Sequence, residues 1–301
     1  EHQYFGVNPN CTWLQRMFDE GNVAIINNVY GATNRDHSHA TLILESANTE
    51  SGPRDSEQSG WAGRLSHACD QNIVSVSKFI RPVCFGPDLI NPKSHNNARV
   101  IGAEDSRNMG LYEFNGGLYE FDNDSETWQA DRRGYMARAL NSYYAAKHQA
   151  MAPNTQYQRV MQSERSLRTY GAKMKELVSA SLDSFALPES LSALYEEYGT
   201  NLLNDAGFGM QVRNIYDVVN FLDIFEASII SADYAGWDHH RKLRDNIEPA
   251  LTDIFGAGKG FETLFSELSQ AAGDRLIILV YGEFGRQLAA NGDNGIDHGV
   301  G

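Results

Sequence analysis

Two apolar runs in this sequence each lead directly into residues that carry aspartate and histidine. The run EASIISADYAG precedes Asp238, His239 and His240, and the run LIILVYG leads into a glycine-rich stretch with Asp297 and His298. Apolar runs of this length are typical of buried strands. The residues between them form helical patterns, so we predict a right-handed strand–helix–strand unit. In such a unit both clusters lie at the carboxyl edge of a parallel sheet, where ligands bind.

Carboxylate oxygens and imidazole nitrogens are the ligands that divalent metals accept in proteins. Asp297 and His298 stand between Gly295 and Gly299, which let the backbone bend and direct both side chains to one point. An ordinary glycine-rich turn with a capping aspartate would show the same local pattern. Two such clusters after two predicted strands favour a shared metal site over coincidence.

A third polar stretch, NRDHSHATLILESA, contains His37, Ser38 and His39. The apolar residues that follow have helical spacing, so Ser38 is predicted near a helix N-terminus, where the dipole favours an anion or a developing negative charge. Ser38 could equally be only the N-cap of that helix. The two flanking histidines favour a functional role, since an HxH pair beside a serine can contribute to one metal site.

The rest of the chain supports one α/β domain, because no linker rich in Pro, Ser or Gly divides it. The helical spacing of residues 11–20 predicts a helix that ends at Gly21, and NVAIINNVYG then predicts a short buried strand. Residues 60–69 predict a helix with Trp61 and Leu65 facing inward. Residues 70–125 are irregular, with two short apolar runs. The composition of residues 125–200 predicts a mainly helical insertion.

Composition narrows the classes of partner. The net charge of -14 argues against nucleic acid, since phosphate backbones bind clustered Lys and Arg. No apolar run approaches the roughly 20 residues that a membrane span needs. The cysteines at positions 11, 69 and 84 fit neither a disulfide framework nor a zinc finger. The sequence begins at Glu1 rather than Met and stops two residues beyond Gly299, so we expect a natural chain that is longer at both ends. Composition does not specify an oligomeric state.

Four short words, GWDHH, GEFGRQ, GIDHG and HSH followed by GWAGR, occur in an order that resembles the bacterial family called domain of unknown function 1501. The resemblance extends from Trp13 to Gly299. That family is itself similar to the alkaline phosphatase and sulfatase superfamily. The resemblance implies a doubly wound α/β fold, with a mostly parallel sheet flanked by helices, and by analogy a periplasmic or cell-envelope location after twin-arginine export.

The resemblance also implies a set of metal ligands. Asp297 and His298 match the superfamily pair of Asp and His before Gly. Asp238 and a following histidine match the second pair, and either His239 or His240 could be the residue that faces the site. The implied cofactor is one or more divalent ions, with zinc, manganese, magnesium and calcium all open.

The catalytic residues that the resemblance implies are Ser38, His39, Glu283 and Arg286. Ser38 with His39 matches the family's Ser-His pair at the place of the superfamily nucleophile. Glu283 and Arg286 match the family's Glu-Phe-Gly-Arg word. Arg286 could clamp anionic oxygens and Glu283 could orient a ligand histidine. Alternatively the two residues form only a mutual ion pair.

These residues favour metal-assisted hydrolysis of a small phosphate or sulfate ester. The second hypothesis is a non-catalytic protein that binds a ligand or a protein partner on the same fold. The third is a zinc peptidase, although the sequence lacks the HExxH motif of the common helical zinc site.

Overall fold

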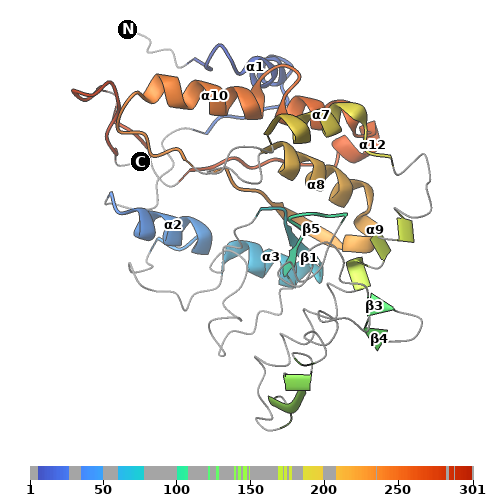
Figure 1. Ribbon diagram of the computed structural model, residues 1–301. Helices are drawn as coiled ribbons and strands as arrows, with labels where there is room; N and C mark the ends of the chain where they lie inside the picture. The colour runs from blue at the N-terminus through green and yellow to red at the C-terminus, as the bar shows by residue number, and fades with distance from the viewer. Residues whose placement is uncertain are drawn as a thin grey trace. The chain divides into compact units, whose positions relative to one another are not determined.

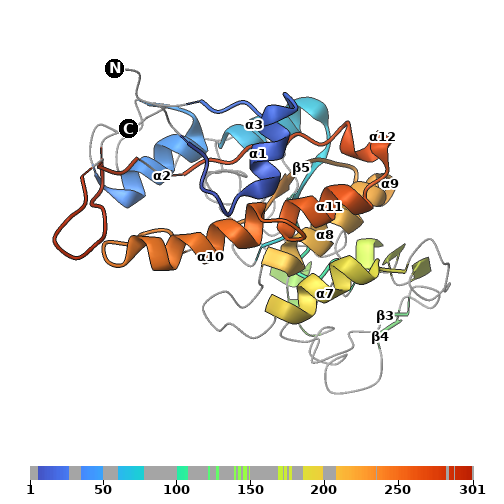
Figure 2. The ribbon, with the colours of Figure 1, turned by 90° about the horizontal axis from the view of Figure 1, so that it is seen from above.

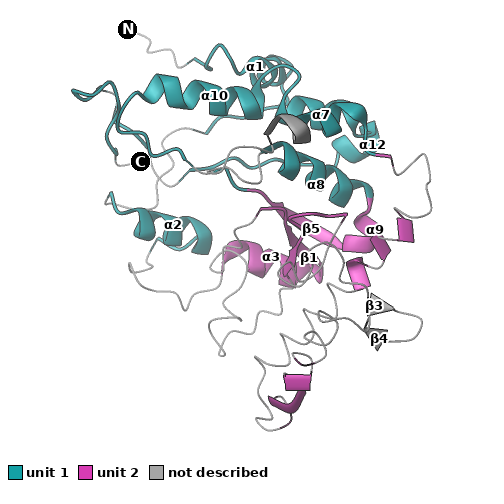
Figure 3. Ribbon diagram, viewed as in Figure 1, with its two compact units in different colours: residues 1–58, 187–220, 233–301 teal, residues 59–186, 221–232 magenta. Residues whose placement is uncertain are grey.

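The computed structural model describes residues 6–26, 35–49, 60–77, 100–107, 121–122, 127–128, 186–198, 208–234, 236–282, 285–287 and 289–299, with single positions between 139 and 177. The described residues belong to two compact units (Figure 3). Unit 1 comprises residues 1–58, 187–220 and 233–301, and unit 2 comprises residues 59–186 and 221–232.

Unit 2 contains a small parallel sheet in the order β2-β1-β5 (Figure 1). The strands are β1 (Asn72–Ser75), β2 (Val100–Gly102) and β5 (Ala227–Ser231). Ile73 of β1 pairs with Val100 on one side and with Ile229 on the other. Ile73 is fully buried because apolar β-branched residues pack against both neighbours in a central parallel strand.

Helices and a second strand pair complete unit 2. Helix α3 (Trp61–Cys69) packs against β1 and β5, with Ala62 in contact with the buried sheet residues. Helix α9 (Leu222–Phe225) leads into β5, and β3 (Phe121–Asp122) pairs with β4 (Thr127–Trp128) in antiparallel fashion. The predicted mixed α/β class with a parallel sheet is therefore confirmed. Leu65 was predicted to face inward but is 47% exposed, because α3 buries Ala62, Gly63 and Ser66 instead.

Unit 1 is built from helices that pack around aromatic side chains. They are α1 (Thr12–Asp19), α2 (His37–Ser46), α7 (Glu189–Tyr198), α8 (Phe208–Asn220), α10 (Leu243–Phe255), α11 (Gly260–Glu267) and α12 (Gln270–Gly273). Helices α7, α8 and α11 contact one another (Figure 2). The ring of Phe261 on α11 lies 5.2 Å from Phe208, 5.9 Å from Trp13 and 5.9 Å from Phe255, measured between ring centroids.

Helix α1 ends as its sequence predicts. Gly21 has φ of +79°, a conformation that glycine adopts without steric cost. The N–H of Gly21 donates to Phe18 O and the N–H of Asn22 donates to Met17 O, which satisfies two of the last carbonyl groups of the helix.

One predicted strand is wrong, and a second is absent from the part of it that the structure describes. Residues 276–282 form no strand, and Ile277 is 92% exposed. Residues 22–26 of the predicted strand NVAIINNVYG likewise form none, with Ile26 77% exposed, and its residues 27–31 lie outside the described structure. Apolarity favours a strand only where a neighbouring strand accepts its backbone hydrogen bonds, and neither segment pairs with another strand among the described residues. The second half of the predicted strand–helix–strand unit is therefore absent from the described structure.

Most of the predicted helical insertion at 125–200 lies outside the described residues, so it stays a prediction, as does the organisation as one domain. Among the described helices, none combines the length and apolarity required to cross a bilayer. Cys11 is buried and Cys69 is exposed, and both are free thiols.

Candidate metal centre

Histidines and aspartates from three distant segments meet at one end of unit 1. We call this group the His-Asp cluster; it consists of His37, Asp238, His240, Asp297 and His298. His37 begins α2, Asp238 and His240 precede α10, and the last two lie in the C-terminal loop, coloured red in Figures 1 and 2. The convergence of the two sequence clusters is thus realised, with a histidine from the third stretch added.

Three ligand atoms form a tight triangle at the centre of the cluster. Asp238 Oδ1 lies 3.0 Å from His240 Nε2 and 2.7 Å from His298 Nε2. The two Nε2 atoms are 3.0 Å apart. Ligand atoms around a tetrahedral zinc ion, each about 2.0 Å from it, lie about 3.3 Å from one another. The triangle is therefore slightly smaller than one face of such a coordination sphere.

His37 adds a third nitrogen to this group. Its Nε2 lies 3.3 Å from Asp238 Oδ2, and its ring meets that of His298 edge-on at 4.6 Å between centroids. One ligand atom from each of His37, Asp238 and His298 lies within 4.8 Å of the others. Three imidazoles and one carboxylate fit zinc better than manganese, magnesium or calcium, which prefer oxygen ligands.

Asp297 orients His240. Asp297 Oδ1 lies 3.0 Å from His240 Nδ1, so that a proton on Nδ1 leaves the lone pair of Nε2 directed at the central triangle. A carboxylate behind a histidine in this manner is the usual arrangement around metal-binding imidazoles. Asp297 was predicted as a direct ligand; in this structure its carboxylate contacts the far side of His240.

Arg286 holds the two loops of the cluster together. Its Nη1 donates to Ile296 O at 3.0 Å, and its Nη2 donates to Trp237 O at 3.2 Å and to Asp238 Oδ1 at 2.6 Å. Arg286 also pairs with His298 through an isolated antiparallel bridge. The guanidinium group is thus bonded to both segments that carry the central triangle.

Gly299 allows the close approach of these segments. A Cβ atom at this position would lie 2.9 Å from the carbonyl carbon of Arg286, which is closer than real Cβ contacts. The N–H of Gly299 donates to Gly285 O at 2.9 Å. The glycine after the Asp-His pair is therefore explained by backbone packing.

The electrostatics of the cluster keep both carboxylates ionised. Partial burial raises the pKa of Asp238, but hydrogen bonds from His298 and Arg286 outweigh this effect, and its pKa lies well below the ordinary value. Hydrogen bonds from His240 and Asn291 lower the pKa of Asp297. Both aspartates are about half-exposed, so a ligand can reach them from solvent.

The choice between the two histidines after Asp238 falls on His240. His240 contacts Asp238, Asp297 and His298, whereas the side chain of His239 takes no part in these contacts. His239, which the sequence left as an alternative ligand, therefore lies beside the cluster rather than in it.

The structure describes some of the predicted catalytic residues but not all of them. Asp36 is the N-cap of α2, and its side chain accepts from His39 N, so Ser38 is not the cap. Ser38 is exposed in the first turn, next to His37. Glu283 lies outside the described residues, so its predicted role and its pairing with Arg286 stay predictions.

Sequence reasoning missed two members of the site. His37 was noted only as one half of the HSH pair, although this pair was the signal that could have identified it. Asn291 was not singled out, yet its Nδ2 donates to Asp297 Oδ1 at 3.1 Å and to His240 O at 2.9 Å. Asparagine is so common in glycine-rich loops that its presence there does not by itself indicate a functional residue.

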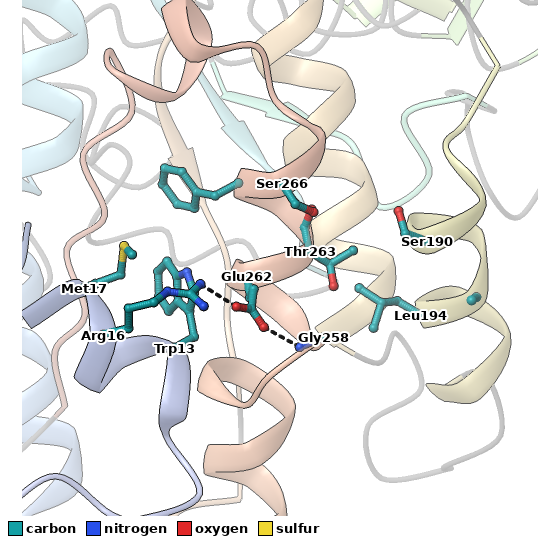
Figure 4. Close-up of a pocket in the computed structure, with 11 residues that line it drawn as sticks. Trp13, Arg16, Met17, Ser190, Leu194, Gly258, Glu262, Thr263 and Ser266 are labelled. Atoms are coloured by element: carbon teal, nitrogen blue, oxygen red, sulfur yellow. Dashed lines mark hydrogen bonds and ion pairs between the residues drawn. The ribbon is translucent and has the colours of Figure 1, made fainter. Parts of the chain in front are cut away.

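A separate pocket of about 660 Å³ lies between α1, α7 and α11 (Figure 4). Arg16 and Met17 line it from α1, Ser190 and Leu194 from α7, and Glu262 from α11. The Arg16 guanidinium pairs with Glu262, which also accepts from Gly258 N. These polar groups satisfy each other, and the pocket shares no residue with the His-Asp cluster.

Comparisons with known proteins place the chain in a family without an assigned activity. Neither the curated proteins nor the solved structures contain a match. A family model described as "Protein of unknown function (DUF1501)" matches residues 21–301. Since this match covers nearly the whole chain, the protein belongs to the DUF1501 family.

Proposed function

We propose that the protein is a metal-dependent hydrolase of small phosphate or sulfate esters. The observation that carries the proposal is the convergence of imidazole nitrogens on Asp238: His240 and His298 form a triangle with Asp238, and His37 joins Asp238 and His298 from the other side. The wider likeness to alkaline phosphatases and sulfatases, with their doubly wound fold, and a cell-envelope location are parts of the same proposal.

In this proposal the four residues hold the cation through one carboxylate oxygen and three imidazole Nε2 atoms. Asp297 keeps the proton of His240 on Nδ1, so that Nε2 faces the cation. When bound, a divalent cation withdraws charge from ester oxygens and lowers the pKa of an attacking hydroxyl or water. Zinc suits this ligand set best among the cations considered, and manganese is the oxygen-preferring comparison.

Ser38 is the proposed nucleophile. It is exposed in the first turn of α2, beside the His37 ligand. The positive end of the α2 dipole favours an anionic ester and the negative charge that develops on the serine oxygen. Its neighbour His39 lies in the same turn and could accept the proton of the hydroxyl.

Arg286 has a holding role in this proposal. Its Nη groups already donate to Asp238 and to two backbone carbonyl groups, so the side chain fixes the Asp238 carboxylate. Clamping of the ester by Arg286 would require it to leave these acceptors.

Metal titration of neighbouring histidine variants tests the proposal. Metal-free protein is titrated with Zn²⁺ and Mn²⁺ against a chromogenic chelator, and hydrolysis of p-nitrophenyl phosphate and p-nitrophenyl sulfate is then measured. We expect one bound ion in the unsubstituted protein, loss of binding in His240→Ala, and full binding in the matched control His239→Ala. Ser38→Ala should bind metal but lose turnover.

Two results would contradict the proposal. A folded protein that binds neither cation would show that the His-Asp cluster is only a hydrogen-bond network. Metal binding without turnover of either ester would remove the hydrolase assignment and favour a binding role.

A further inference from the structure

The side chain of Asn291 uses its full hydrogen-bonding capacity inside the C-terminal loop. Its Nδ2 donates to His240 O at 2.9 Å and to Asp297 Oδ1 at 3.1 Å. Its Oδ1 accepts from Asp293 N at 3.0 Å and from Gly295 N at 2.9 Å. A primary amide offers two donors and one carbonyl oxygen with two lone pairs, so each capacity has a partner.

The chemistry of the partners fixes the orientation of this amide. Both groups near Nδ2 are acceptors, namely a backbone carbonyl oxygen and a carboxylate oxygen, whereas both groups near Oδ1 are backbone N–H donors. An exchanged oxygen and nitrogen would produce four repulsive contacts. Asn291 therefore donates to acceptors on one side of the loop and accepts from donors on the other, which an apolar side chain cannot do.

We infer that Asn291 is a positioning residue that fixes the imidazole of His240 through Asp297. The Asp297 oxygen that accepts from Asn291 is the same Oδ1 that lies 3.0 Å from His240 Nδ1. The second Nδ2 bond holds the backbone of His240 itself. Asn291 thus restrains both the ring and the main chain of one residue in the central triangle.

The backbone around Asn291 reinforces this restraint. The N–H of Asn291 donates to Gly295 O at 2.8 Å, which closes the loop from Asn291 to Gly295. The N–H groups of Lys242 and Leu243 donate to Asp293 O and Asn294 O. The loop is therefore bonded to the start of α10, close to His240 in the sequence.

The metal-related part of this inference rests on the proposed function, whereas the orientation of His240 does not. Asn291→Asp separates positioning from loop folding, because an aspartate keeps an oxygen acceptor for Asp293 N and Gly295 N. The same variant removes both Nδ2 donors and places a second carboxylate beside Asp297. Asn220→Asp is the matched control, since Asn220 is exposed and its Nδ2 donates to Tyr216 O at 3.0 Å, within its own helix.

The first measurement needs no metal. In metal-free protein with ¹⁵N-labelled histidine, a two-bond ¹H–¹⁵N NMR correlation spectrum of the imidazole rings reports which ring nitrogen carries the proton. The signals of His240 are assigned by their absence from the spectrum of His240→Ala. We expect His240 to carry its proton on Nδ1 in the unsubstituted protein and in Asn220→Asp. Asn291→Asp should populate both tautomers or change the His240 shifts. A loss of unfolding free energy no larger than that expected for two missing hydrogen bonds is the sign of an intact loop.

The second measurement uses Zn²⁺ for affinity and Co²⁺ for its absorption spectrum in the visible range. We expect Asn291→Asp to weaken Zn²⁺ binding about 10- to 100-fold, the range measured for groups behind a ligand histidine, and to change the Co²⁺ spectrum. An unchanged His240 tautomer in Asn291→Asp would overturn the inference, whether or not the protein binds metal. Absence of Zn²⁺ binding by the unsubstituted protein would instead overturn the proposed function.

Discussion

Asp297 Oδ1 lies 3.0 Å from His240 Nδ1, on the side of the ring that faces away from Asp238 and His298. The Asp297 carboxylate therefore contacts one imidazole of the central triangle from behind and is not itself a corner of that triangle. This relationship separates two kinds of aspartate in one cluster. Asp238 contributes an oxygen to the central triangle, and Asp297 determines where a neighbouring proton resides.

The first prediction compares removal of an orienting group with removal of a ligand. We expect Asp297→Asn to weaken Zn²⁺ binding about 10- to 100-fold, because His240 keeps its place but loses its charged partner. His298→Ala should weaken binding further, because it removes one corner of the triangle. Competition with a chelator of known affinity measures both. Equal losses in the two variants would mean that Asp297 is itself a ligand.

The second prediction concerns acid stability. The pKa of Asp238 is lowered in the folded protein, so its contribution to the free energy of unfolding is present above its unfolded value of about 3.9 and is lost as pH falls through the lower folded value. Because Asp238 is half-exposed, we expect a contribution of about 1 kcal/mol or less.

Urea unfolding of the unsubstituted protein and of Asp238→Asn, both metal-free, measures this contribution. The difference between them should shrink as pH falls below about 4. A difference that stays constant down to about pH 2 would contradict the assigned pKa shift.

The third prediction concerns Gly295, whose backbone lies against the backbone of His240. A Cβ atom on Gly295 would overlap the carbonyl group of His240, so Gly295→Ala forces the two segments apart. We expect a loss of about 1–3 kcal/mol in the free energy of unfolding and weaker Zn²⁺ binding. Gly292→Ala is the control in the same loop, because a methyl group on Gly292 would have no heavy atom within 4 Å. Similar effects of the two substitutions would argue against the close approach.

The fourth prediction concerns the packing of α1 in unit 1. Trp13 is 7% exposed and stacks on Phe265 with ring centroids 5.7 Å apart. Trp13→Ala should cost about 3–5 kcal/mol of unfolding free energy, as deletion of a buried aromatic ring usually does. Phe18, on the same helix, is 48% exposed, and Phe18→Ala should cost less than about 1 kcal/mol. Chemical denaturation distinguishes the two, and equal costs would contradict the assigned face of α1.

The cluster could be predicted in large part because its chemistry is local in the sequence. Asp238 with His240, and Asp297 with His298, each form a short motif. An aspartate and a histidine this close in the sequence are typical of a metal or catalytic site. The roles within the cluster could not be predicted, since the distinction between ligand and orienting carboxylate depends on which ring nitrogen of His240 faces which oxygen. That is a matter of three-dimensional geometry.

The fold could be predicted less completely. β5 and the helices after it follow from their apolar periodicity, and both appear in the structure. Residues 276–282 have an equally apolar sequence but form no strand, because strand formation requires a partner that a single segment does not specify. Pairing depends on residues far away in the chain, whereas helix formation depends on neighbours within a few positions.

In the sequence about two hundred positions separate His37 from Asp238, and a further stretch of chain separates Asp238 from His298. A ribosome adds about 5–20 residues each second, so the first histidine emerges many seconds before the last. A nascent chain therefore cannot assemble the cluster until residue 298 has been synthesised and has left the exit tunnel. Any ion bound there must therefore bind after translation of the whole segment, when all the helices of unit 1 have already been synthesised.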